Sequence, residues 1–256
     1  MEEKVYILNP KNQKLAAVIH RPKADGKYPA VVLLHGFTGN KEEGHIKQLA
    51  VELADNGFVA IRFDASGYGE SEGDTEKDYR MTNYFSDTKS VYDYLRNLPY
   101  VDPDRIGIFG HSLGGMLVVL FAAKHPAIKA VVPVSAPYHL ETHYRLKGIW
   151  NGWQEKGYRE AKSNGKTVRI PWAFLEDAKR YNALVEVRKI KGPILFIVGT
   201  SDVNVLPKET QKLFEEANEP KELFVVRGMD HYYKNFEEKL VIVNEKVLKF
   251  FKKYLQ

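Results

Sequence analysis

The feature of this sequence that most constrains its fold is a repeated alternation between short apolar runs and longer segments of helical periodicity. A strand in a parallel sheet is buried on both faces and is almost continuously apolar, whereas a covering helix buries only one stripe. The apolar runs are Ala30–Leu34, Val59–Phe63, Ile106–Phe109, Ala130–Val134, Ile194–Val198 and Leu223–Val226. The helical segments are Glu42–Asn56, Asn83–Asn97, Leu113–Lys124, Lys208–Ala217 and Phe236–Leu255. The alternation predicts an α/β fold with a doubly wound sheet.

Two further strands are expected at the start of the chain. Lys4–Leu8 and Lys14–Arg21 are β-prone runs, and the residues between them, Asn9-Pro10-Lys11-Asn12, are typical of a turn. This pattern predicts an N-terminal hairpin. Added to the six buried runs, it gives a mostly parallel sheet of eight strands.

One segment interrupts the alternation. Between residues 138 and 181 no strand–helix unit fits, and all three tryptophans of the chain fall there. Asn164-Gly165 followed by Thr167–Ile170 suggests a small hairpin within it. We therefore predict one core domain formed by residues 1–137 and 182–256, with residues 138–181 inserted as a lid.

Composition excludes several classes of protein. The chain has no cysteine, which rules out disulfides, thiolate metal sites and a cysteine nucleophile. Its net charge of +5 is spread among interspersed acids and bases, so no basic stripe for nucleic acid is expected. The N-terminus lacks the pattern of a signal peptide, and no apolar run is long enough for a membrane span. These features favour a cytoplasmic protein, and the abundance of Lys and Glu would suit a thermostable one.

A candidate nucleophile lies between a predicted strand and a predicted helix. Ser112 is the centre of Gly110-His111-Ser112-Leu113-Gly114, which follows Ile106–Phe109 directly. In a sharp strand-to-helix turn the glycines allow close backbone contacts while the serine hydroxyl stands clear of the sheet. The alternative is a glycine-rich turn with an incidental serine. The motif in this context predicts nucleophilic catalysis by Ser112.

A serine nucleophile needs a histidine base and an acid that orients it. Asp202 follows the strand Ile194–Val198, and His231 follows Leu223–Val226, in the chain order expected of this arrangement. Asp230 adjoins His231 and is interpreted as a loop or cap residue. Asp64 is interpreted as an anchor for the Gly67–Gly69 turn. The other histidines are assigned to the core or the surface, and His111 is expected to point away from Ser112.

Negative charge that develops on a substrate oxygen needs backbone donors. The amide of Leu113, which follows the nucleophile, is one candidate, and that of Phe37, in the loop after Ala30–Leu34, is the other. His139 and His143 have a spacing that could place two histidines on one helical face, but their glutamate is misplaced for a metalloprotease, so no metal site is predicted.

These motifs resemble those of the α/β-hydrolase family, and within it the small bacterial and archaeal carboxylesterases that include cinnamoyl and feruloyl esterases. The resemblance spans nearly the whole chain and rests on Gly-His-Ser-Leu-Gly-Gly at 110–115, His35–Lys41, Arg62–Asp64 with Gly67-x-Gly69-Glu70-Ser71, Gly199-x-x-Asp202 and Asp230-His231. It implies a Ser112–His231–Asp202 triad, oxyanion amides at Phe37 and Leu113, no cofactor, and ester hydrolysis through an acyl-enzyme.

The resemblance also implies that the insertion is a lid over the substrate. Tyr138, Trp150, Trp153 and Trp172 are candidates for substrate contact, and packing of the lid onto the core is the alternative for the tryptophans. The expected partner is a small-molecule ester, and a homodimer is left open. A peptidase or acylaminoacyl hydrolase would use the same triad, whereas a non-catalytic ligand-binding scaffold would be expected to lose one of its members.

Overall fold

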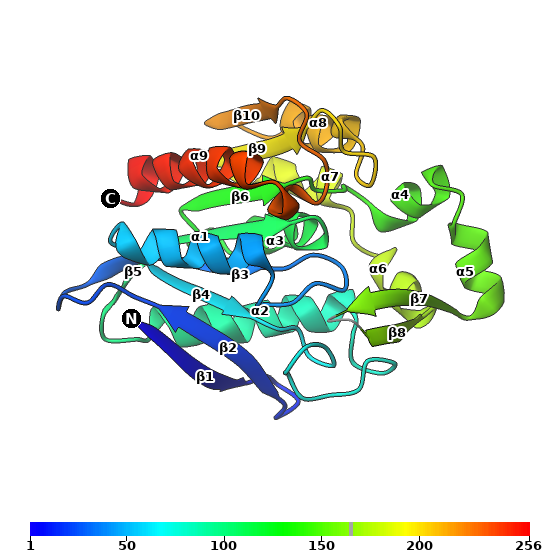
Figure 1. Ribbon diagram of the computed structural model, residues 1–256, viewed down its shortest axis with the longest axis horizontal. Coiled ribbons are helices and arrows are strands. Elements are labelled where there is room, and N and C mark those ends of the chain that lie inside the picture. The colour runs from blue at the N-terminus through cyan, green and yellow to red at the C-terminus, as the bar shows by residue number, and fades with distance from the viewer. Residues whose placement is uncertain (164–165) are drawn as a thin grey trace.

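The computed structural model describes residues 1–163 and 166–256. Its centre is a sheet of eight strands in the order β1-β2-β4-β3-β5-β6-β9-β10 (Figure 1). The strands span Glu2–Leu8 (β1), Lys14–His20 (β2), Tyr28–Leu34 (β3), Val59–Phe63 (β4), Val101–His111 (β5), Ala130–Val134 (β6), Ile194–Gly199 (β9) and Lys221–Val226 (β10). The predicted α/β class and the predicted strands are confirmed.

The two N-terminal strands form the antiparallel edge of the sheet. β1 pairs with β2 as a hairpin in which Leu8 lies opposite Lys14, and β2 pairs antiparallel with β4. All other neighbours in the sheet run parallel. The carboxyl ends of β3, β5, β6, β9 and β10 therefore meet at one edge, where open α/β sheets place their ligands.

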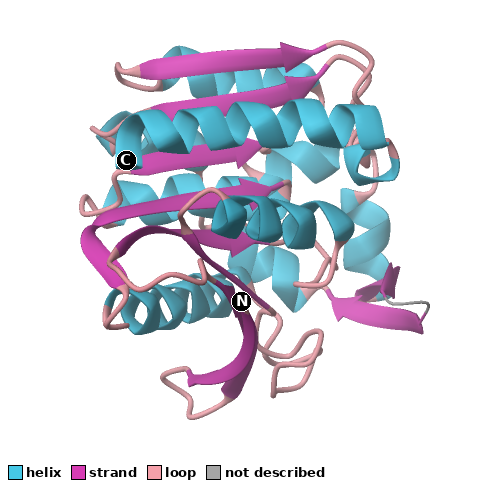
Figure 2. Ribbon diagram, turned by 60° about the vertical axis from the view of Figure 1, so that its left-hand side comes forward, coloured by secondary structure: helices cyan, strands magenta, loops and turns pink. Residues whose placement is uncertain are grey.

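Helices cover both faces of the sheet (Figure 2). α1 (Gly44–Asp55) and α9 (Glu237–Leu255) pack on one face. α2 (Met81–Arg96), α3 (Leu113–Lys124) and α8 (Pro207–Glu216) pack on the other. Alternate residues of each strand point to opposite faces, so in β3 Val31 joins the core under α1 and α9 while Val32 joins the other core. Two separate cores explain why the strands are apolar on both sides.

The inserted segment, residues 138–181, lies beyond the carboxyl ends of the parallel strands (Figure 1). It contains α4 (Leu140–Leu146), α5 (Trp150–Lys156), an antiparallel pair β7 (Tyr158–Ser163) and β8 (Lys166–Pro171), and α6 (Ala173–Ala178). The short α7 (Ala183–Glu186) and the 3₁₀ turn η1 (Val187–Lys189) lead back to β9. The predicted hairpin is present, although its predicted turn, Asn164-Gly165, lies outside the described residues.

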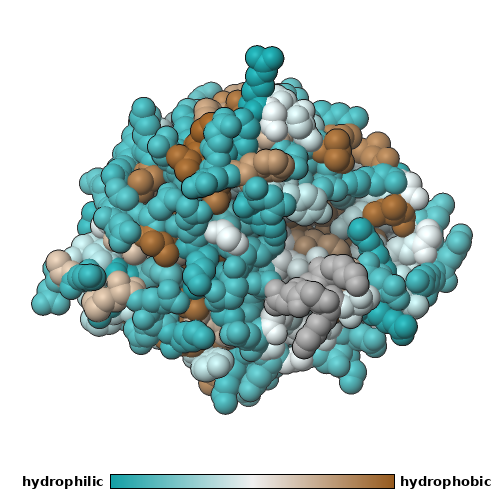
Figure 3. All heavy atoms as spheres, viewed as in Figure 1, coloured by the Kyte–Doolittle hydropathy of each residue, from teal (hydrophilic) through white to brown (hydrophobic). Residues whose placement is uncertain are grey.

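Polar residues cover most of the face shown in Figure 3, and hydrophobic residues are scattered among them. Among the described helices, none has the length and apolarity needed to cross a membrane.

Candidate active site

Ser112 lies on a strained turn between β5 and α3. Its φ of +56° is unusual for a residue with a β-carbon, so the surrounding structure must hold it there. Ser112 N donates to the Val134 carbonyl at 2.8 Å. A β-carbon at Gly110 would come within 2.2 Å of the Gly114 carbonyl oxygen, and one at Gly114 within 2.6 Å of the His35 carbonyl oxygen. Both glycines are therefore required by close backbone packing, as the sequence predicted.

The structure brings Ser112, His231 and Asp202 together in one chain of hydrogen bonds. His231 Nε2 lies 3.0 Å from Ser112 Oγ, and His231 Nδ1 lies 2.9 Å from Asp202 Oδ2. A carboxylate only accepts, so Nδ1 donates to Asp202 and Nε2 is left to accept from the serine hydroxyl. Asp202 is buried, with 2% of its surface exposed, and its other oxygen accepts from two backbone amides, Asn204 N and Val205 N, each at 2.9 Å.

The loops that carry Asp202 and His231 pack tightly against each other. A β-carbon at Gly199 would come within 2.1 Å of the Met229 carbonyl oxygen, so glycine is needed where β9 ends. Ser201 N donates to that same carbonyl at 3.0 Å. Asp230 accepts from Tyr232 N at 2.8 Å, which is the local loop role predicted for it. The close packing holds Asp202 and His231 in register across two neighbouring strands.

The loop after β3 approaches Ser112 closely enough to supply a second donor. A β-carbon at Gly36 would lie 3.2 Å from Ser112 Cβ. Thr38 holds the loop in place, because its amide donates to Tyr79 Oη and its carbonyl accepts from Tyr68 Oη, both at 3.0 Å. Within the described residues, no acceptor takes the amide N–H of Phe37 or of Leu113. Both amides are thus free for a ligand, and their role as an oxyanion hole stays a prediction.

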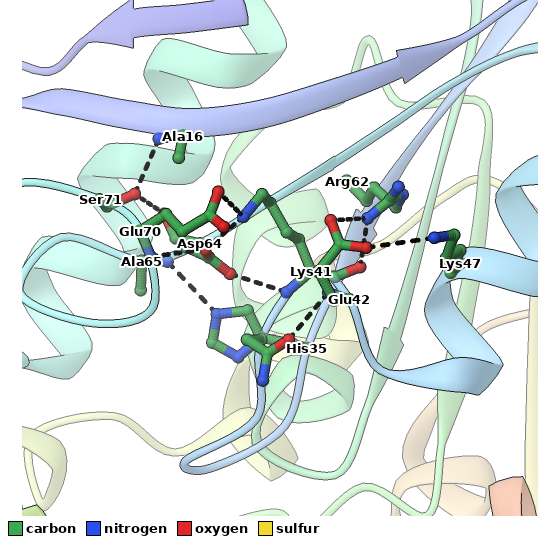
Figure 4. A network of polar contacts seen from close by, with 11 residues as sticks. Ala16, His35, Lys41, Glu42, Lys47, Arg62, Asp64, Ala65, Glu70 and Ser71 are labelled. Carbon is green, nitrogen blue, oxygen red and sulfur yellow. Dashed lines mark hydrogen bonds and ion pairs between the residues drawn. The ribbon is translucent and has the colours of Figure 1, made fainter. Parts of the chain in front are cut away.

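A buried ionic network fastens the far end of this loop to β4 (Figure 4). Asp64 accepts from Lys41 N at 2.7 Å, from Lys41 Nζ at 2.9 Å and from Glu70 N at 2.9 Å. Lys41 Nζ also donates to Glu70 Oε2 at 2.7 Å, and Arg62 Nη1 donates to the Lys41 carbonyl at 2.8 Å. The prediction that Asp64 anchors the turn around Gly69 agrees with these contacts, which in addition tie that turn to the loop carrying Phe37.

Ser112 and His231 open onto a pocket with a volume of about 380 Å³. The loop after β3 contributes one part of its wall, including Phe37, and the inserted segment contributes much of the rest. Pockets of 300 to 1,000 Å³ are typical for small ligands, and this one is near the lower limit. The geometry therefore places an oriented serine hydroxyl, a base and two unused backbone donors around a space that suits a small molecule.

A model of the Peptidase_S9 family, described as the prolyl oligopeptidase family, matches residues 45–256. The chain belongs to the prolyl oligopeptidase family. The match includes all three residues of the hydrogen-bonded chain, and the loop with Phe37 lies before it.

Curated relatives are similar to this family member over part of their length. YcjY of Escherichia coli K12, itself uncharacterized, is 37% identical over 185 residues, which are 66% of this chain and 57% of YcjY. Rv2307c of Mycobacterium tuberculosis H37Rv, also uncharacterized, is 27% identical over 208 residues, which are 80% of this chain and 64% of that protein. The alignments thus span about three fifths of these relatives.

Solved structures match this prolyl oligopeptidase family member over nearly its whole length. Est1E from Butyrivibrio proteoclasticus, solved with ferulic acid bound, has a TM-score of 0.80 and 25% identity, and 98% of each chain is covered. An esterase from Pyrococcus furiosus has a TM-score of 0.75 and 23% identity over 100% of this chain and 94% of the other. The α/β hydrolase GrgF from a Penicillium species has a TM-score of 0.82 and 18% identity over 100% of this chain and 99% of the other. The predicted α/β-hydrolase fold and the resemblance to esterases of this kind are confirmed.

The aromatic residues predicted to contact substrate are not among the residues that line the pocket. Trp150 and Trp172 meet edge to face with ring centroids 4.8 Å apart. Trp153 donates from Nε1 to the Ile170 carbonyl at 3.1 Å. The half-buried Tyr138 lies at the base of the inserted segment, where its carbonyl accepts from Ala183 N. Of the two roles expected for the tryptophans, packing is the one that the described contacts show.

Sequence reasoning missed the polar residues of the inserted segment that do line the pocket, notably His143, Lys147 and Arg159. The spacing of His139 and His143 had suggested only a metal site. The two rings instead bond to different partners, His139 to the Lys179 carbonyl and His143 to the carboxylate of Glu209. No metal-binding group of three or more ligands occurs among the described residues.

The ring of His231 packs against a buried group of three other rings, those of His111, His45 and Tyr233. The ring centroid of His111 lies 4.8 Å from that of His231 and 4.8 Å from that of His45, and Tyr233 packs 5.4 Å from both His111 and His45. His111 was expected only to turn away from Ser112; the structure adds a packing contact with His231. Neither nitrogen of His45 has a hydrogen-bond partner within the described residues.

This burial predicts loss of stability in acid. Burial lowers the pKa of His45 from 6.5 to about 4, so the unfolded chain takes up a proton before the folded one does. The free energy of unfolding is therefore unaffected by this residue above pH 6.5 and decreases as the pH falls toward 4. The decrease due to His45 is about 3 kcal/mol. We expect urea unfolding to show a smaller loss between pH 7 and pH 4 in His45→Leu than in the natural protein. An equal loss in both proteins would contradict the assignment to His45.

Proposed function

We propose that this protein is a serine hydrolase that cleaves small carboxylic esters through an acyl-enzyme on Ser112. The observation that carries the proposal is the continuous hydrogen-bonded chain from Ser112 Oγ through His231 to the buried Asp202, which opens onto a small pocket. A serine hydroxyl becomes a useful nucleophile when an adjacent base, itself oriented by a third group, can take its proton.

The first half of the reaction forms the acyl-enzyme. Ser112 Oγ attacks the ester carbonyl carbon while His231 Nε2 takes the hydroxyl proton, and Asp202 stabilises the imidazolium that results. The amides of Phe37 and Leu113 donate to the oxyanion. When the intermediate collapses, the bond to the alcohol breaks and His231 returns the proton to the leaving alcohol. In the second half, water attacks the acyl carbon, again through His231, and releases the acid.

Two observations bear on the substrate. Est1E was solved with ferulic acid bound, which supports hydroxycinnamoyl esters as candidates for this chain. The family description refers to an oligopeptidase, which supports amide cleavage as the second candidate. Paired substrates with one acyl group separate these alternatives: p-nitrophenyl butyrate against butyryl p-nitroanilide, with methyl ferulate as the third compound.

A fluorophosphonate probe tests the proposal directly, because it reacts only with an activated serine. We expect stoichiometric labelling, with the adduct mapped by mass spectrometry to the peptide that contains Ser112. Protein unfolded in urea provides the control and should stay unlabelled. A folded protein that takes up no label would overturn the proposal and favour a non-catalytic binding scaffold.

A further inference from the structure

The wall of the pocket carries an uneven set of charges. Two acidic residues line it, and the first, Glu43, forms an ion pair with Lys234. The second, Glu160, is exposed, and its Oε1 lies 3.9 Å from Nε of Arg169, which is outside the pocket. The inserted segment contributes three basic side chains to the wall, His143, Lys147 and Arg159. For each of them, either a carboxylate of the protein neutralises the charge or the charge remains available to a ligand.

His143 is neutralised. Its Nδ1 lies 3.1 Å from Glu209 Oε1 and 3.2 Å from Oε2, and both side chains are buried. If the imidazole is protonated, the carboxylate balances its charge, and if it is not, the pair carries the single negative charge of Glu209. His143 therefore adds no net positive charge to the wall.

Lys147 is held at the pocket by neutral oxygens alone. Its Nζ donates to the Asn204 carbonyl at 3.0 Å, to Asn204 Oδ1 at 3.2 Å and to the Val203 carbonyl at 3.3 Å. It forms no ion pair within the described chain. These contacts fix the ammonium beside the loop that begins at Asp202, without cancelling its charge.

Arg159 is the second cation without a carboxylate. Its guanidinium carbon lies 5.8 Å from the ring centroids of both Tyr144 and Trp153. The rings restrict the orientation of the guanidinium, and one of its N–H groups donates to the Tyr144 hydroxyl. A guanidinium has five N–H donors, so the others remain for a ligand. No ion pair of Arg159 is found among the residues that the structure describes.

The two cations line the same pocket. Burial lowers the pKa of Lys147, the charges of Asp202 and Glu209 oppose this effect, and the positive charge of Arg159 adds to it. An anion between Lys147 and Arg159 would relieve their repulsion. A guanidinium binds a carboxylate through two parallel hydrogen bonds, and a nearby ammonium can add a third.

We propose that the pocket selects small esters that carry a carboxylate, held by Arg159 and Lys147 while Ser112 attacks the ester carbonyl. The inference rests on the proposed esterase function and names its substrate class. Ile149 and Val205, which also line the pocket, provide apolar contact for the hydrocarbon between the two ends of the substrate. The carboxylate can belong to the acyl group or to the alcohol, and the substrates below distinguish these cases.

The test compares each carboxylate with its neutral carboxamide of nearly equal shape. For the acyl side, the pair is ethyl hydrogen adipate and ethyl 5-carbamoylpentanoate, followed by ethanol release. For the alcohol side, it is 4-carboxyphenyl butyrate and 4-carbamoylphenyl butyrate, followed by phenol release. We expect kcat/KM for the carboxylate to exceed that for the carboxamide by about tenfold or more in one pair, as for a charge-assisted hydrogen bond.

Variants assign the preference to the two cations. In Arg159→Gln and in Lys147→Gln the carboxylate-to-carboxamide ratio of kcat/KM should fall about tenfold. Lys156→Gln is the matched control, because Lys156 lies on the same segment with its Nζ over the Tyr158 ring and off the pocket wall. Its ratio should equal that of the natural protein. A natural protein that prefers both carboxamides, or a ratio that neither pocket variant lowers, would overturn the inference.

Failure of the proposed function would look different. Calorimetry with Ser112→Ala measures binding of adipate and of 4-hydroxybenzoate without any reaction. One outcome is that the natural protein neither hydrolyses any ester nor reacts with fluorophosphonate, while Ser112→Ala binds an anion and Ser112→Ala/Arg159→Gln does not. That outcome supports the anion site and rejects the esterase. Ester hydrolysis with no preference for carboxylates and no binding of either anion supports the esterase while rejecting the anion site.

Discussion

Replacing Ser112 with alanine is expected to lower ester turnover on the order of 10⁶-fold while the protein stays folded, as in enzymes where serine and histidine act as a unit. The reason is that alanine removes the only atom in the hydrogen-bonded chain that can form the acyl bond, whereas its small side chain fits the turn. The measurement is kcat for p-nitrophenyl butyrate, together with circular dichroism to establish folding. Ser90→Ala, a serine on α2 whose hydroxyl donates to the Ser86 carbonyl, is the control and should keep full activity.

A double variant distinguishes joint action of Ser112 and His231 from a purely structural role of Ser112. Once the serine is absent, His231 has no proton to take, so Ser112→Ala/His231→Ala should be no slower than Ser112→Ala alone. Multiplied losses in the double variant would show that the two residues act independently. That result, or turnover at the natural rate in Ser112→Ala, would be incompatible with the proposed mechanism.

Replacing Asp64 with asparagine is expected to destabilise the fold by about 3 kcal/mol, the effect of leaving a buried charge without its partner. Lys41 and Asp64 are only 2% and 1% exposed at their side chains. Burial alone would lower the pKa of Lys41, but the carboxylates of Glu70 and Asp64 outweigh it and raise that pKa. Asparagine keeps the shape of the side chain and can still accept from the Lys41 amide. Its NH2 group replaces the oxygen that accepts from Lys41 Nζ and Glu70 N, so the expected loss reports the charge together with these two hydrogen bonds.

The control for this prediction is Glu70→Gln. Glu70 contacts the same ammonium, but 61% of its side chain is exposed, and exposed ion pairs contribute about 1 kcal/mol or less. Urea unfolding of both variants at pH 7 gives the comparison. An equal loss of stability in Asp64→Asn and Glu70→Gln would show that the buried ion pair does not stabilise the attachment of the Phe37 loop to β4.

The sheet and the hydrogen-bonded chain were predictable because their signals are local in the sequence. A strand buried on both faces must be apolar along its length, and the turn at Ser112 needs glycine at Gly110 and Gly114 whatever surrounds it. Asp202 and His231 follow the carboxyl ends of two parallel strands, and parallel strands bring those ends to one edge. The residues that come together there could therefore be named before their positions were known.

The pocket wall was not predictable in this way. The tryptophans of the inserted segment were candidates for substrate contact, with packing as the alternative. Trp150 and Trp172 pack against each other and Trp153 bonds to the Ile170 carbonyl, while Arg159 and Lys147 line the pocket. Nothing in the spacing of these residues indicates which side turns inward, because the inserted segment has no long periodic element whose buried stripe would decide it.

The sequence by itself determined the order of strands and helices along the chain, the turn that presents Ser112, and Asp202 and His231 as the residues that meet it, since each depends on short-range backbone geometry and on where strands end. Only the tertiary structure decided which charges remain unpaired around the pocket. That outcome depends on contacts between distant segments, such as Glu43 with Lys234 and His143 with Glu209, and local sequence does not encode which partner a charge meets.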